Sequence, residues 1–148
     1  MLRQLGLRIG LIVLTVSSGV TGAWALLAPR SFYDDFPGGG RSWVSALPPY
    51  NEHLVRDVGG LYLALTLVLL AAAVVMERRL VIVALVAALA NAVPHLIFHV
   101  AHVDELSTGD QIAQTASLVL LLVVPLALLP VAVASKEGGR YTEPAERG

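Results

Sequence analysis

The stretch that decides the fold is residues 80–98, LVIVALVAALANAVPHLIF, in which no Asp, Glu, Lys or Arg occurs. A helix needs about 20 such residues to cross a hydrocarbon core of about 30 Å. Three further uncharged stretches have a similar length, namely Ile9–Pro29, Val58–Met76 and Ile112–Ser135. Because 56% of the residues are hydrophobic and only 14% are charged, the chain has too little polar surface for a soluble domain. The sequence therefore predicts a multi-pass membrane protein.

The links between these stretches set the predicted topology. The expected spanning helices cover residues 9–29, 54–76, 80–102 and 111–135. They form a single membrane domain over residues 1–135, and the short links between the later helices make successive helices antiparallel. A disordered cytoplasmic tail is expected over residues 136–148, which are rich in charged residues and glycine. The predicted fold class is thus all-α, an antiparallel bundle of four transmembrane helices.

Basic residues set the expected orientation. Seven lie on the side of both termini and of the turn at 77–79: Arg3, Arg8, Arg78, Arg79, Lys136, Arg140 and Arg147. The other side carries three, Arg30, Arg41 and Arg56. By the positive-inside rule, both termini are expected to be cytoplasmic, in a multi-pass protein of the plasma membrane.

The first hydrophobic stretch has a second interpretation. That interpretation is a cleaved signal peptide, because basic residues precede an apolar run that closes on Ala23-Trp24-Ala25, a small-x-small pattern typical of a cleavage site. A retained span is favoured by small residues that permit close helix packing, namely Ser17, Ser18, Gly19, Thr21 and Gly22.

The outer segment over residues 30–50 is long and aromatic. Its aromatic residues are Phe32, Tyr33, Phe36, Trp43 and Tyr50, and glycine and proline interrupt it at 37–40 and 48–49. Aromatic side chains are enriched at membrane interfaces. The segment is therefore expected to be a structural interfacial anchor or, alternatively, a lid over a site at this end of the bundle.

All four histidines lie near the outer ends of the second and third predicted spans. With a rise of about 1.5 Å per residue, His53 is level with His102, and Asp57 with His99. The turn of about 100° per residue places Asn91, His95, His99 and His102 in one arc of the third span. Gln111, Gln114 and Thr115 reach the same layer on the fourth span. Because polar groups in hydrocarbon are costly, these rows are expected to face the bundle interior.

These side chains suggest a metal or cofactor site near the outer membrane face. The predicted metal ligands are His53, Asp57, His95, His99 and His102. Two i,i+4 pairs, His53 with Asp57 and His95 with His99, have the spacing at which one ion is chelated on a helix. Imidazole and carboxylate ligands favour zinc or iron, with copper or manganese as alternatives. Haem is the less favoured cofactor, with His95 and Asn91 as its binding residues.

Two other interpretations of the polar rows stay open. They form a structural cluster that fixes helix packing, or a metal-free site for protons or substrate. No catalytic set is identified, but Asp57 and Glu52 are candidates for proton transfer. Without cysteine there is no thiol chemistry, and with a net charge of −1 there is no basic patch for nucleic acid.

Two segments carry a resemblance to a known group of proteins. Residues 49–59, PYNEHLVRDVG, and residues 94–102, PHLIFHVAH, together with the four-span layout over residues 5–135, resemble small actinobacterial four-helix membrane proteins that are broadly DoxX-like. The resemblance implies a redox or quinone-linked role, as an oxidoreductase or an accessory subunit. The expected substrate is a lipid-soluble molecule such as a quinone. The alternatives are a non-enzymatic subunit that binds a membrane protein partner or a second copy, and a small proton-coupled carrier.

Overall fold

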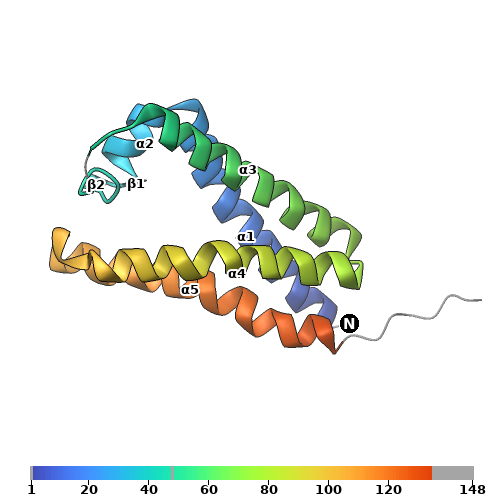
Figure 1. Ribbon diagram of the computed structural model, residues 1–148. Helices are drawn as coiled ribbons and strands as arrows, with labels where there is room; N and C mark the ends of the chain where they lie inside the picture. The colour runs from blue at the N-terminus through green and yellow to red at the C-terminus, as the bar shows by residue number, and fades with distance from the viewer. Residues whose placement is uncertain (1, 48, 135–148) are drawn as a thin grey trace, which may run out of the picture.

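The computed structural model describes residues 2–47 and 49–134, and these residues are mainly helical (Figure 1). The elements are, in order, α1 (Leu2–Leu27), α2 (Pro29–Asp35), β1 (Pro37–Gly38), β2 (Arg41–Ser42), α3 (Glu52–Val75), α4 (Arg78–Ala101), the 3-10 turn η1 (Val103–Glu105) and α5 (Thr108–Val133). Of these, α1, α3, α4 and α5 are long and apolar enough to cross a membrane. The prediction of an all-α protein with four such helices is confirmed.

The helices begin outside the uncharged stretches that predicted them. α1 begins at Leu2, so that Arg3 and Arg8 lie within the helix, and α3 begins at Glu52. Charged residues are compatible with a helix that continues beyond the hydrocarbon core. The aromatic segment contains the short helix α2 and the antiparallel pair β1–β2. The tail predicted over residues 136–148 lies outside the described residues.

Side-chain caps fix where the last three spanning helices start. The Asn51 side chain accepts a hydrogen bond from Leu54 N, and the Glu77 carboxylate accepts from the backbone N–H groups of Arg79 and Leu80. Ser107 accepts from Asp110 N at 3.3 Å. Such caps satisfy donors that have no partner within the helix. Between α3 and α4, Met76 adopts a left-handed conformation with φ of 55°, which makes the link very short.

The spanning helices form two pairs. α1 packs along α3, and α4 packs along α5. The pairs meet at the end that carries the Met76–Glu77 turn, the turn end, and separate toward the opposite end (Figure 1). That opposite end carries α2, β1, β2 and η1 and is called the aromatic end. The bundle is therefore wedge-shaped, open between the pairs at its aromatic end.

The apolar core is concentrated at the turn end. Leu11, Leu69 and Leu85 are fully buried there, together with small residues such as Ala72 and Ala84. Toward the aromatic end, α1 and α3 cross through glycines. A Cβ atom on Gly59 would lie 2.5 Å from the backbone nitrogen of Leu26, so the two helix backbones are in contact. Small residues at helix crossings permit such close approach.

Aromatic rings hold the segment after α1 against the α1–α3 pair. The ring centroids of Phe32 and Phe36 are 4.8 Å apart, and Trp24 lies 5.9 Å from Phe36. Phe36 also contacts the Trp43 ring edge to face at 6.3 Å. The tip of the strand pair consists of Gly38, Gly39 and Gly40, all with positive φ, a conformation that glycine adopts without strain. This packing places Trp43 between the α1–α3 pair and the start of α5.

Candidate functional site

A cavity of about 580 Å³ lies between the two helix pairs, on the side of the aromatic end. Its walls come from α1, α3, α4 and α5, and residues of the segment over 32–47 complete its lining. Most lining side chains are apolar, for example Leu14, Val58 and Leu121. A cavity of this size, within the range of small-molecule sites, is a candidate binding site.

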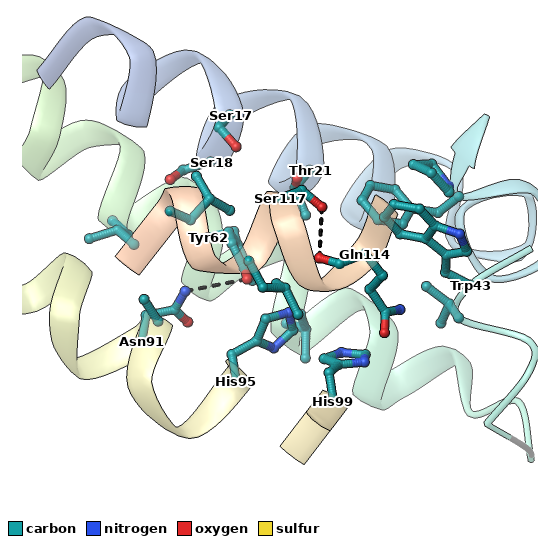
Figure 2. Close-up of a pocket in the computed structure, with 18 of the residues that line it drawn as sticks. Ser17, Ser18, Thr21, Trp43, Tyr62, Asn91, His95, His99, Gln114 and Ser117 are labelled. Carbon is teal, nitrogen blue, oxygen red and sulfur yellow. Dashed lines mark hydrogen bonds between the residues drawn. The ribbon is translucent and has the colours of Figure 1, made fainter. Parts of the chain in front are cut away.

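Polar side chains from all four spanning helices reach this cavity (Figure 2). They are Ser17, Ser18 and Thr21 of α1, Tyr62 of α3, Asn91, His95 and His99 of α4, and Gln114 and Ser117 of α5. Among the described residues that line the cavity, none is Asp, Glu, Lys or Arg. The site is thus polar but formally uncharged.

The polar row of α4 forms one wall of the cavity. Asn91, His95 and His99 are spaced four residues apart and point into the same space (Figure 2). The His95 and His99 rings meet edge to face, with centroids 4.6 Å apart. The Asn91 amide donates a hydrogen bond to the Tyr62 hydroxyl at 3.3 Å, which links α4 to α3. α4 continues through Pro94, so the proline does not interrupt this row.

α5 contributes a buried amide at the outer part of the cavity. The Gln114 residue is only 4% exposed, and its side chain faces the His99 ring (Figure 2). The Ser117 hydroxyl donates to the backbone oxygens of Ala113 and Gln114, at 2.8 and 2.9 Å. The buried Gln114 amide therefore lies beside His99, whereas the Ser117 hydroxyl proton is already used within α5.

His102, the fourth member of the predicted α4 row, lies outside the cavity lining. Its ring stacks on Phe98 with centroids 4.3 Å apart, and its Nδ1 donates to the Phe98 carbonyl at 2.8 Å. The residue is exposed and caps the C-terminal end of α4. The structure thus gives His102 a role at the helix end.

The polar pair at the start of α3 also lies apart from the α4 histidines. His53 Nε2 lies 3.3 Å from Asp57 Oδ2, and these side chains are 86% and 56% exposed. Glu52 pairs with Arg56 at 2.9 Å, and Arg56 also donates to the Leu26 carbonyl. The two proton-transfer candidates therefore each have a partner on the surface of α3: Asp57 pairs with His53, and Glu52 pairs with Arg56.

The predicted five-ligand metal site is not assembled in this structure. Within residues 2–47 and 49–134, no three side chains of the His, Asp or Glu type are grouped so that they could hold a metal ion. The depth argument placed His53 and Asp57 level with the α4 histidines on the premise of parallel helices, but the helix pairs separate at this end (Figure 1). Of the predicted ligands, His95 and His99 are brought together, and metal binding itself stays a prediction.

The segment over 32–47, which lines the aromatic end of the cavity, contacts α5 through the Asp110 carboxylate. Trp43 Nε1 donates to Asp110 Oδ1 at 2.8 Å, and Arg41 lies 3.4 Å from the same oxygen. The Ser107 hydroxyl donates to the other carboxylate oxygen at 2.7 Å. Trp43 is 9% exposed and lines the cavity. The aromatic segment thus bridges the two helix pairs above the cavity, the geometry expected of a lid.

Several site residues were not identified from the sequence. Ser17, Ser18 and Thr21 were interpreted as helix-packing residues, and Tyr62 was not singled out. The available signal was that uncharged polar side chains inside a predicted span turn away from lipid. Trp43 was identified only as an aromatic residue of the segment over 30–50, and Asp110 was not singled out, because a contact across 67 positions in the sequence leaves no local pattern.

Comparisons of the chain with protein-family models, with curated proteins and with solved structures gave no match. The resemblance to DoxX-like proteins therefore stays an expectation.

Proposed function

We propose that this chain is an integral membrane protein that binds a lipid-soluble molecule in the cavity between its two helix pairs. The observation that carries the proposal is that polar side chains of α1, α3, α4 and α5 surround one cavity with mainly apolar walls. Apolar walls with a few polar groups that converge are typical of small-molecule sites. Polar groups at membrane depth are costly unless they pair or serve a function.

A quinone is the candidate molecule that we favour. It is lipid-soluble, and its ring would fit against the apolar walls while its oxygens receive hydrogen bonds from the polar row. This assignment keeps the redox or quinone-linked role that the resemblance to DoxX-like proteins implies. A purely structural polar cluster is the weaker explanation, because side chains that only fix helix packing need no cavity of about 580 Å³ between them.

The site is proposed to face the outer leaflet of the plasma membrane. Arg78 and Arg79 lie at the turn end together with the start of α1, which carries Arg3 and Arg8. The positive-inside rule then makes the turn end cytoplasmic and the aromatic end external. Both termini are cytoplasmic in this orientation.

Cysteine labelling tests this orientation. The chain contains no cysteine, so Leu106→Cys, in the link between η1 and α5, introduces a single thiol. We expect a membrane-impermeant maleimide to label this variant on intact cells, and Glu77→Cys, at the turn end, only after the cells are opened. The reverse labelling pattern would show that the aromatic end is cytoplasmic and the turn end external.

Ligand content tests the binding proposal. Thr21 lines the cavity, whereas Val20, its neighbour, is 60% exposed on the lipid side of α1. We expect Thr21→Phe to fill part of the cavity and to reduce the bound molecule at least about ten-fold, which corresponds to about 1.4 kcal/mol. Val20→Phe is the matched control and should retain the ligand. Organic extraction of the purified proteins followed by mass spectrometry measures the content.

The same preparations separate the alternative cofactors. Elemental analysis would detect zinc, iron, copper or manganese held by His95 and His99, and an absorption spectrum would reveal a haem. Metal that is present in the Val20→Phe protein and lost in Thr21→Phe would support the metal hypothesis. Equal contents of every extracted compound and metal in the wild type and both variants would contradict the proposed binding function.

A further inference from the structure

The cavity offers no charge to a ligand. Its described lining contains serine, threonine, tyrosine, asparagine, histidine and glutamine, but no Asp, Glu, Lys or Arg. An ionised headgroup placed there would lose its hydration without gaining a counter-charge. Such burial costs several kcal/mol or more, so charged groups in apolar surroundings are normally paired.

Apart from Asp104 and Glu105, which are exposed on η1 and do not line the cavity, the charged residues near the aromatic end are already paired. Arg41 and Trp43 both bind Asp110, as described above. Three i,i+4 pairs hold most of the others, namely Arg30 with Asp34, Glu52 with Arg56, and His53 with Asp57, and Asp35 accepts a hydrogen bond from Ser31. To serve a ligand, any of these groups would have to give up its partner and enter the cavity.

His95 is a polar side chain of α4 that the described residues leave without a hydrogen bond, as they do the hydroxyls of Ser17, Ser18 and Thr21 of α1. It lines the cavity, half-buried, on α4 between Asn91, which donates to Tyr62, and His99. Its ring contacts His99, but no described residue forms a hydrogen bond with its nitrogens. A neutral imidazole has one N–H donor and one nitrogen acceptor. In a membrane span these groups need partners, and here the ligand is the available one.

We infer that the bound molecule is uncharged and carries a carbonyl or hydroxyl oxygen that forms a hydrogen bond with His95. The inference rests on the proposed binding function and narrows it to neutral lipids such as ketones, alcohols and quinones. It excludes fatty acids, long-chain amines and phospholipid headgroups. A carbonyl oxygen would accept from the imidazole N–H, whereas a hydroxyl could also donate to the bare ring nitrogen.

A panel of four probes with one chain length tests the inference. The probes are undecanol, undecanone, undecanoic acid and undecylamine, each with bromine at the chain end, because bromine quenches tryptophan fluorescence at short range. The protein has two tryptophans, and Trp24→Phe leaves Trp43, which lines the cavity, as the reporter. Thr21→Phe in the same background measures quenching by probe dissolved in the detergent.

We expect the alcohol and the ketone to bind at least about ten-fold more tightly than the acid and the amine at neutral pH. His95→Leu should weaken both neutral probes about five- to ten-fold, the effect of one lost hydrogen bond. His95→Gln keeps a donor and an acceptor and should restore most of the affinity. His102→Leu, outside the cavity, is the matched control and should change nothing.

Three results would overturn the inference. If the acid or the amine binds as tightly as the alcohol, and Thr21→Phe removes that binding, the binding function stands but the ligand is charged. If His95→Leu binds all four probes as the wild type does, His95 is not the anchor. If every probe quenches the Trp24→Phe protein and the Trp24→Phe/Thr21→Phe protein equally, both the inference and the binding function are rejected.

Discussion

Gly59→Ala is expected to lower the free energy of unfolding by about 3 kcal/mol, at the upper end of the usual cost of overpacking. The added Cβ would lie 2.5 Å from Leu26 N and 2.9 Å from its Cα. Because these are backbone atoms of α1, no side-chain rotation can relieve the overlap. The two helices must move apart at their crossing, and the contacts between α1 and α3 on either side of it weaken.

The neighbouring glycine provides the control for this prediction. A Cβ on Gly60 would have nothing within 4 Å, so Gly60→Ala should leave the stability unchanged or raise it by up to about 1 kcal/mol through helix propensity. Thermal or denaturant unfolding of both variants, followed by circular dichroism in the same detergent, gives the comparison. Similar stabilities for the two variants would show that α1 and α3 do not cross as closely as described.

The sequence predicts the helices and their polar faces, but not how the helices are arranged relative to one another. The four spanning helices were predictable because the charge-free stretches match the bilayer thickness. The row of Asn91, His95 and His99 was predictable because the helical period puts them on one face. Both properties are local. How far α3 separates from α4 at the aromatic end depends on packing between helices, and no periodicity within one helix records it.

The histidines show the consequence. His53 and Asp57 were predicted to share a site with His99 because they are level with it along the helix axis. That calculation measures depth but not the separation between helices, and in the structure the pair interacts within α3 at 3.3 Å. The outer segment was similarly ambiguous. Its aromatic composition fits both an anchor and a lid, and only the contact of Trp43 with Asp110 shows that it bridges the cavity.

Asp110→Ala is expected to release this bridge and to lower the free energy of unfolding, since hydrogen bonds to charged groups are stronger than those between neutral groups. The carboxylate accepts from Trp43 and Ser107, and it lies in the first turn of α5, where negative charge is favourable. Trp43 should become more exposed, so its fluorescence should shift to longer wavelength in the Trp24→Phe background. Ligand retained in the cavity should exchange faster.

Asp104→Ala separates the bridge from a general effect of charge at this end. Asp104 is an exposed acid in η1 that forms no hydrogen bond or ion pair with the described residues, so its loss should change the stability by less than about 0.5 kcal/mol. Trp43→Phe keeps most of the ring packing but removes the N–H donor. If the bridge is direct, Trp43→Phe combined with Asp110→Ala should be less destabilising than the sum of the two single changes. Strict additivity would instead mean that the two residues stabilise the aromatic end independently, and that the segment over 36–47 is held by its packing on the α1–α3 pair alone.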